Sequence, residues 1–309
     1  MWIRVAIAVG ILTFVGAIAQ GQPAPPSLEP YPLPSKAKEA LCELAGESDI
    51  LILGEIHGTQ EVPALAAALL QPLTEQGYGV LALEIPSDEQ KPLTDLATGK
   101  TETVPTFFAK PWDDGRGNVQ ALALIRTALS PPFKWRLICF DESSAAGNDA
   151  AAIDDPIADA LARDAKMASN LAAERSRLAP ESKVLVICGN FHARTTLPVL
   201  TQNKLDKQDD DAFSKLWPSF AAGLRRNLAG QRINSVNVVP HDGGHFGTTS
   251  SDDGKTFSVG VQPIRAAQKI EEAEAHPLDK QWWDWELNLP RATPATFLAP
   301  PIDPFAAER

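Results

Sequence analysis

Two short segments far apart in the chain share one pattern: a run of apolar residues, a glycine, and a histidine three positions after that glycine. The first contains Gly54 and His57, and the second contains Gly189 and His192. Each apolar run predicts a buried strand. A glycine at the end of a strand lets the backbone turn tightly or approach a ligand closely. Because open α/β sheets bind ligands at the carboxyl ends of their strands, the repeated pattern predicts a catalytic or ligand-binding site built on both histidines.

Further polar side chains follow the same predicted strands. Four of them stand at or just after a strand end, namely Glu55, Glu84, Asp141 and Asn190. If the strands are parallel, these groups and the two histidines converge on one edge of the sheet. Carboxylates beside histidines can hold a water and remove its proton, and a carboxylate desolvated in a cleft has a raised pKa that suits a general base. The same groups can instead bind a divalent metal ion.

These residue types lead to specific expectations. The expected catalytic residues are Glu55, His57, Glu84 and His192. The expected substrate contacts are Asp141, Asn190 and Arg116. A metal ion would take His57, His192 and Glu84 as ligands. His241 and His245 have the spacing of a metal-binding pair on a helix, but the stretch between them is predicted to be a loop, so they are not expected to be ligands. Each site residue also has a structural interpretation, because a histidine after a strand is commonly hydrogen-bonded within the fold, Glu84 can form a buried ion pair and Asp141 can cap a turn.

Two charged residues lie outside the strand ends. Asp164 is on the apolar stripe of a predicted helix, seven residues from both Ile157 and Leu171. A carboxylate that faces a core needs a partner, so Asp164 either orients one of the histidines by a hydrogen bond or pairs with an arginine such as Arg163. Arg116 lies in a glycine-flanked loop, where its planar guanidinium could recognise a carboxylate, a phosphate or a polarised carbonyl, or simply face solvent.

The pattern along the chain predicts the elements that hold these residues. Four apolar runs predict strands at residues 49–54, 79–84, 135–140 and 183–188. Helical patterns lie between them, and the longest spans about 155–178. Strands alternating with helices predict an α/β fold with a mainly parallel sheet and helices on both faces. Residues 233–239 and 256–261 predict an antiparallel hairpin at the edge of the sheet.

The two ends of the chain differ from the middle. Residues 1–19 combine a basic start, an apolar run and a small-residue cleavage pattern, which predicts a secretory signal peptide. The alternative is an uncleaved membrane anchor, but the run is shorter than the roughly 20 residues that a span needs. Residues 20–34 predict a proline-rich linker, 35–265 the α/β domain and 266–309 an irregular tail. The expected location is therefore secreted or periplasmic, with no transmembrane anchor.

Composition narrows the function classes. Acidic residues outnumber basic ones by 39 to 28, and the net charge of −11 argues against a nucleic-acid partner. The chain has no Gly-x-Ser-x-Gly elbow, no phosphate-binding loop, no dinucleotide fingerprint and no Cys-x-x-Cys pair. Two of the three cysteines, Cys139 and Cys188, lie inside apolar strand runs, where cysteine behaves as a small hydrophobic residue, so no disulfide framework is expected.

Five short motifs together resemble the erythromycin esterase, ChaN-like and Tiki superfamily. They are Leu53-Gly-Glu-Ile-His-Gly58, Leu83-Glu-Ile-Pro86, Asp114-Gly-Arg116, Arg163-Asp-Ala-Lys-Met-Ala168 and Gly189-Asn-Phe-His-Ala193. The resemblance covers residues 49–195 in order and ends there. Members of this superfamily include esterases that open macrolide lactones, haem-binding uptake proteins, and metal-dependent proteases with two Gly-x-x-His motifs. The resemblance implies that Glu55, His57, Glu84 and His192 line the site, with Arg116 and Asp164 nearby.

Residues and resemblance together lead to two principal functions. The first is an exported hydrolase acting on a small-molecule or peptide substrate, in which Glu55 or Glu84 activates a water while His57 and His192 position it or stabilise the oxyanion. The alternative is a haem-binding uptake protein, in which histidines ligate the iron and only Tyr31 and Tyr78 could supply a phenolate. A third class is a binding domain that keeps the fold without catalysis. The expected cofactor is a divalent metal ion, haem, or neither.

Overall fold

The computed structural model describes residues 28–112, 114–143, 155–197, 215–250, 257–264, 269–278 and 281–299. The predicted signal peptide lies outside these residues. Among them, no helix is both long enough and apolar enough to cross a membrane. The end of the predicted linker is described and lies against the domain, because Leu28, Tyr31 and Leu33 pack on its core and the Tyr31 amide donates to the Ala64 carbonyl at 3.0 Å.

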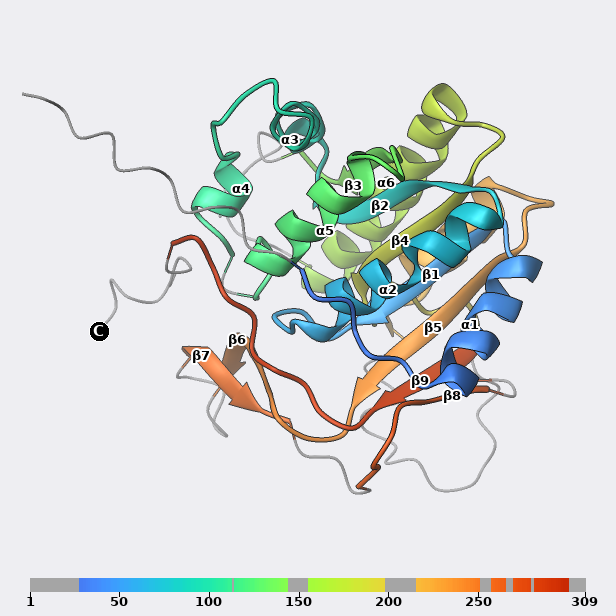
Figure 1. The fold of residues 1–309 in the computed structure, drawn as a ribbon, viewed down its shortest axis with the longest axis vertical. Helices are drawn as coiled ribbons and strands as arrows, with labels where there is room; N and C mark the ends of the chain where they lie inside the picture. Colours follow the sequence, from blue (N-terminus) through green and yellow to red (C-terminus); the bar gives the residue numbers. More distant parts are fainter. Residues whose placement is uncertain are drawn as a thin grey trace, which may run out of the picture.

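Within the described residues, a seven-stranded sheet forms the centre of the fold (Figure 1). Its strands, in spatial order, are β3 (Arg136–Asp141), β2 (Tyr78–Pro86), β4 (Lys183–Gly189), β1 (Ile50–Glu55), β5 (Ile233–Pro240), β9 (Trp285–Leu289) and β8 (Glu274–Pro277). Every neighbouring pair is parallel except β8 and β9. The prediction of an α/β fold with a mainly parallel sheet is confirmed, and β1 to β4 are the four strands expected from the apolar runs.

Helices cover both faces of this sheet (Figure 1). One face carries α1 (Ser35–Glu47), α2 (Glu61–Glu75), the short 3-10 turn η1 (Ser87–Glu89), α3 (Gln90–Ala97), α4 (Thr106–Ala109) and α5 (Val119–Leu129). The other carries α6 (Pro156–Leu178) and α8 (Phe220–Asn227). The central strands therefore have two buried faces; in β1, Leu51 and Leu53 pack into one core while Ile50 and Ile52 pack into the other. This explains why the strands are continuous apolar runs rather than alternating ones.

Local signals in the sequence set where the site-bearing helices begin. The Asn118 side chain accepts the Ala121 amide at 2.8 Å and caps α5, just after the loop that holds Arg116. The Asp155 side chain accepts the amides of Ile157 and Ala158 and caps α6, with proline in the first turn. These caps fix the register of the two helices, which deliver charged residues to the carboxyl end of the sheet.

The predicted hairpin exists, but its strands and its place differ from the expectation. Residues 233–239 form β5, which lies inside the main sheet and is parallel to β1. The hairpin instead joins β6 (Gly244–Ser250) to β7 (Phe257–Pro263) in a separate two-stranded sheet. The polar Ser235 of β5 is buried, and Asp284 accepts its backbone amide at 2.9 Å.

The tail also differs from the expectation of an irregular segment. Its described part contributes β8 and β9, so the sheet continues beyond residue 265. Asp284, just before β9, accepts hydrogen bonds from Arg225 at 2.8 Å and Thr195 at 3.1 Å. The tail is therefore joined to α8 and to the segment that follows β4.

Candidate functional site

The two glycine–histidine motifs end side by side. Strands β1 and β4 are neighbours, with Glu55 paired to Gly189. A Cβ atom at Gly189 would lie 2.9 Å from His57 Nε2 and 3.3 Å from His192 Cδ2, so any larger residue would displace the rings that flank this position. A Cβ atom at Gly54 would lie 2.8 Å from the Ala193 Cβ. The repeated glycine is thus what lets the two motifs approach each other.

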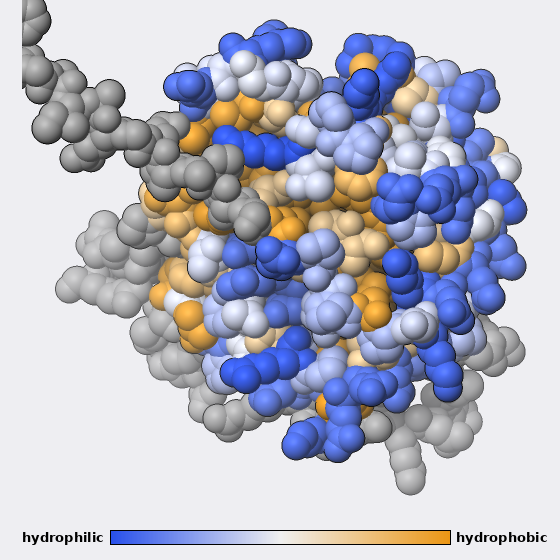
Figure 2. All heavy atoms as spheres, in the orientation of Figure 1, coloured by the Kyte–Doolittle hydropathy of each residue, from blue (hydrophilic) through white to orange (hydrophobic). Residues whose placement is uncertain are grey.

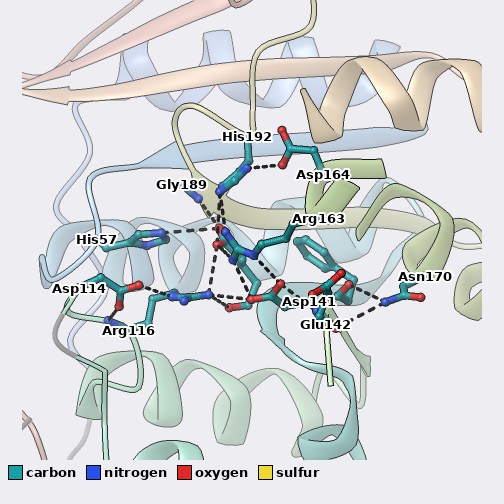
Figure 3. Close-up of polar contacts among 12 residues, drawn as sticks. His57, Asp114, Arg116, Asp141, Glu142, Arg163, Asp164, Asn170, Gly189 and His192 are labelled. Carbon is teal, nitrogen blue, oxygen red and sulfur yellow. Dashed lines mark hydrogen bonds and ion pairs between the residues drawn. The ribbon is translucent and has the colours of Figure 1, made fainter. Parts of the chain in front are cut away.

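Glu84, on β2, lies between the two imidazoles, which point toward a common centre (Figure 3). His57 Nε2 is 3.6 Å from Glu84 Oε2, and His192 Nε2 is 3.6 Å from Glu84 Oε1. The Gly189 amide donates to Oε2 at 2.8 Å. The site is therefore organised around one buried carboxylate that faces both histidines.

Two guanidinium groups neutralise this carboxylate. Arg163 Nη2 donates to Glu84 Oε1 at 2.6 Å, and Arg116 Nη1 donates to the same oxygen at 3.2 Å. Burial raises the pKa of Glu84. The charges of His192, His57 and the two arginines lower it by more, so the net pKa lies well below the ordinary value. Desolvation was expected to raise the pKa of the carboxyl groups in this cleft. For Glu84 this is wrong, because the paired cations outweigh desolvation and leave a weakly basic carboxylate.

Asp141 anchors the same two arginines. Its Oδ2 accepts from Arg163 Nη2 at 2.8 Å and from Arg116 Nη1 at 2.9 Å, and its Oδ1 accepts from Arg163 Nε at 3.0 Å. Burial raises the pKa of Asp141, but hydrogen bonds and charge from the arginines lower it overall. A second carboxyl group, Asp114, accepts from Arg116 Nε at 2.8 Å. Asp141 thus holds the guanidiniums in place rather than standing free for a substrate.

His57 has a different environment from Glu84. Glu55 Oε1 lies 2.9 Å from His57 Nδ1 and fixes the ring orientation. Burial lowers the pKa of His57, but the charge of Glu84 and the hydrogen bond and charge of Glu55 raise it more, so that the net pKa is above the ordinary value. With the Nδ1 proton directed at Glu55, the Nε2 atom is the one that can take up a proton.

His192 is held in a different way. Its Nδ1 lies 2.5 Å from Asp164 Oδ1, and its Nε2 lies 3.2 Å from Arg163 Nη1. A guanidinium can only donate, so Nε2 accepts this bond and the ring proton is on Nδ1, directed at Asp164. The carboxylate on the apolar stripe of α6 therefore does contact a histidine. His192 already uses its lone pair, whereas none of the described residues donates to Nε2 of His57.

This arrangement does not fit the metal site that the sequence suggested. Among the described residues, no group of three or more His, Cys, Asp or Glu side chains is arranged to hold a metal ion. As metal ligands, His192 would offer its Nε2 atom and Glu84 its Oε1 atom. Both atoms already accept hydrogen bonds from Arg163. A cation in that position would compete with a guanidinium already held by Asp141.

A cavity of about 40 Å³ opens beside His57. Glu55, His57, Glu84 and Arg116 line its polar side, while Asp141 and Asn190 are absent from its lining. Asn190 contributes through its backbone, since its amide donates to the Glu55 carbonyl at 2.9 Å and its carbonyl accepts from Trp283 at 2.9 Å. At roughly 10–15 Å³ per water, the cavity has room for about three water-sized groups.

The tyrosines suggested for haem are also occupied elsewhere. Tyr78 is buried at the start of β2, at the opposite end of that strand from Glu84, and its hydroxyl donates to the Ala45 carbonyl at 3.1 Å. Tyr31 packs on the core near α2. Neither tyrosine lines the cavity. Neither tyrosine could therefore supply a phenolate ligand at this cavity.

Sequence reasoning did not assign two side chains, Arg163 and His245, to this centre. Arg163 was noted only as a structural ion-pair partner, yet it contacts Glu84, Asp141 and His192. His245 lies on β6, whose Phe246 amide donates to the Gly58 carbonyl at 2.9 Å, so that β6 lies against the turn after His57. The Nδ1 atom of His245 is buried without a hydrogen-bond partner among the described residues. Burial and the nearby His57 lower its pKa.

Neither a family model nor a curated protein matches the sequence. Solved structures do. A Bacillus cereus protein matches with a TM-score of 0.57 and 16% identity, over 84% of this chain and 93% of the other. A mutant of the erythromycin esterase EreC, in its open conformation, matches with a TM-score of 0.54 and 13% identity, over 82% of this chain and 93% of the other.

The chain has the erythromycin esterase fold. A succinoglycan biosynthesis protein shares it too, with a TM-score of 0.53 and 13% identity over 88% of this chain and 94% of the other. The resemblance seen in the five sequence motifs is thus confirmed in the fold. Those motifs are also the segments that supply Glu55, His57, Glu84, Arg116, Arg163, Asp164 and His192 to the centre described above.

Proposed function

We propose that this protein is a hydrolase that cleaves an ester or a related acyl bond with a water activated by His57. The surroundings of His57 carry the proposal: the ring borders a cavity, Glu55 binds its Nδ1, and its pKa is raised above the ordinary value. A base of this kind takes a proton from water most effectively when its pKa lies near the working pH. The shared fold with an erythromycin esterase supports an ester as the bond that is cleaved.

Glu84 acts in this scheme as a fixed anion and not as the base. Its Oε2 is 3.6 Å from His57 Nε2, close enough to stabilise the imidazolium that forms when water loses its proton. The arginines and the Gly189 amide hold it in place before the reaction begins. Because its pKa is well below the ordinary value, Glu84 stays charged throughout.

Arg116 is the group best placed to stabilise a developing oxyanion. It borders the cavity, and its Nε and Nη1 atoms are committed to Asp114, Glu84 and Asp141. No hydrogen bond to its Nη2 atom occurs among the described residues, so this N–H group remains for a substrate oxygen. A preorganised donor aimed at the developing charge is worth about 10²–10³ in rate. Asp164 and Arg163 act through His192, which they hold in one tautomer.

Export is a separate part of the proposal. The basic start, the apolar run and the small-residue pattern within residues 1–19 support a cleaved signal peptide, and hence a secreted or periplasmic hydrolase. Amino-terminal sequencing of the protein recovered from its native host should begin near Gln20. A chain that still starts at Met1 in the cell interior would overturn export without touching the hydrolase proposal.

The test of the hydrolase is a panel of activated esters and fluorogenic peptides, assayed with wild type, His57→Ala and a matched control, His276→Ala. His276 is half exposed on β8 and lies 3.8 Å from Glu286, far from the residues that line the cavity. We expect ester hydrolysis in wild type and in the control, and a loss of at least 100-fold in His57→Ala. Equal activity in all three proteins would remove His57 as the base. Cleavage of peptides but not esters would keep the site and change the substrate class.

A further inference from the structure

The cavity beside His57 has two unlike sides. Its polar side carries the groups that would do the chemistry. Its other side is formed by buried apolar side chains from strands β2 and β4 and from helices α4 and α5, namely Leu83, Ile85, Phe107, Leu124 and Ile187. Figure 2 shows hydrophobic surface gathered over α4 and α5, the helices that supply Phe107 and Leu124. A substrate whose reacting bond lies at the polar side must therefore place an apolar portion against this wall.

The cavity is small and its apolar wall is rigid. A cavity of about 40 Å³ holds roughly three heavy atoms at 10–15 Å³ each. Its residues lie mainly on regular elements, and α4 is tied down because Glu89 accepts the Phe107 amide at 3.0 Å. Phe107 also packs edge-on against Phe108, with ring centroids 5.4 Å apart. Interiors packed in this way do not expand readily for a longer chain.

The charge around the cavity selects further. Five acidic side chains surround the centre, from Glu55, Glu84, Asp114, Asp141 and Asp164. Within the described part of the chain they face two guanidiniums, Arg116 and Arg163, and both are already paired with these acids. Arg116 Nη2 can take one substrate oxygen, but a second, anionic group against the apolar wall would meet no donor there and the excess negative charge of the centre. The part of the substrate that contacts the apolar wall is therefore expected to carry no charge.

Resting on the proposed hydrolytic function, we propose that the cavity binds the acyl part of a neutral ester, and that this acyl chain is short and aliphatic, about two to four carbons. The ester carbonyl then lies at the polar side, with its oxygen toward Arg116. His57 Nε2 takes a proton from water, the water oxygen bonds to the carbonyl carbon, and the bond from that carbon to the alkoxy oxygen breaks. The proton on Nε2 passes to the leaving oxygen, which yields a carboxylic acid and an alcohol.

Chain length is the direct test. The kcat/KM values of p-nitrophenyl acetate, butyrate, hexanoate, octanoate and hemisuccinate should peak at acetate or butyrate. We expect octanoate and the anionic hemisuccinate each to fall at least 10-fold below butyrate. An open apolar surface would instead gain roughly fourfold per methylene. Highest activity on octanoate, or equal activity on hemisuccinate and butyrate, would overturn the inference while leaving hydrolysis intact.

Matched variants locate the effect in the cavity. Leu124→Ala enlarges the cavity and should lengthen the acyl chain of highest kcat/KM by about two carbons. Leu171→Ala truncates an equally buried leucine in the opposite core and should leave the preference unchanged. Thermal unfolding checks that both variants fold. The same shift in both, or none in Leu124→Ala, would contradict the assignment.

A binding measurement separates this inference from the proposed function. Propionamide and octanamide are not cleaved by a weak esterase, and their binding can be followed by NMR titration of labelled leucine methyl groups. We expect propionamide to perturb the Leu124 and Leu83 methyls and to bind at least 10-fold more tightly than octanamide. If no ester is hydrolysed, the function fails and this titration still decides the cavity. Tighter binding of octanamide would overturn the inference on its own.

Discussion

Gly189→Ala tests the geometry that brings the two histidine motifs together. The new Cβ atom would lie 2.9 Å from His57 Nε2, so the ring has to retreat by roughly 0.5 Å to reach an ordinary contact of about 3.4 Å. Nε2 is the far end of a side chain that borders a cavity, so the ring can move cheaply. The free energy of unfolding should therefore fall by only about 1 kcal/mol, the lower end for added core volume.

The same displacement should cost far more in activity. His57 Nε2 leaves its position 3.6 Å from Glu84 and shifts relative to a bound water. Misplacement of reacting groups by about 1 Å can cost 10²-fold, so a shift of half that size predicts a loss of about 10-fold in kcat/KM. Gly260→Ala is the control, because a Cβ atom there meets nothing within 4 Å. Urea unfolding and ester hydrolysis are measured on both variants. Activity within twofold of wild type in a folded Gly189→Ala protein would refute the argument.

Three further predictions follow from the charges around Glu84. Glu55→Gln removes the charge that helps to raise the pKa of His57, so the acidic limb of the pH–rate profile should move to lower pH; an unmoved limb would mean that Glu55 does not act on the base. Glu84→Gln leaves two partly buried guanidiniums undercompensated and should cost about 3–5 kcal/mol in urea unfolding, against less than 1 for the control Glu174→Gln, whose partner Arg177 is exposed. Since the folded pKa of Glu84 is lowered, its contribution is present above the ordinary value near 4.5 and is lost as the pH falls toward the folded value, so wild type should lose more stability in acid than the variant does. Incubation with excess EDTA should leave kcat/KM unchanged, because Arg163 occupies the ligand atoms of Glu84 and His192; a loss reversed by added zinc would contradict this.

The sequence was informative where a pattern is local. Strands β1 to β4 follow from apolar runs that need two covered faces, and α6 follows from its proline, its capping aspartate and its apolar stripe. The position of Asp164 on that stripe already demanded a partner, and His192 is that partner. The glycine before each histidine could be recognised as a backbone requirement, but the reason, two rings against Gly189, appears only in three dimensions.

What could not be predicted depends on contacts between distant residues. Glu84 meets Arg116, 32 residues away, and Arg163, 79 residues away, and these pairs reverse the expected direction of its pKa shift. Strand β9 was not predicted because tryptophans and prolines surround it in the sequence. Strand β5 carries polar residues whose hydrogen-bond partners lie in the tail. His245 was placed in a loop because nothing local shows that β6 lies against the turn after His57.

The most direct test of the account is the titration of the His57 ring itself. NMR of protein labelled with ¹⁵N at histidine follows the ring nitrogens of His57, assigned by comparison with His57→Ala, while ester hydrolysis is measured over the same pH range. We predict a His57 midpoint above 6.5 that coincides with the acidic limb of kcat/KM. A midpoint below 6.5, or an acidic limb that does not follow this ring, would contradict the role of His57 as the base.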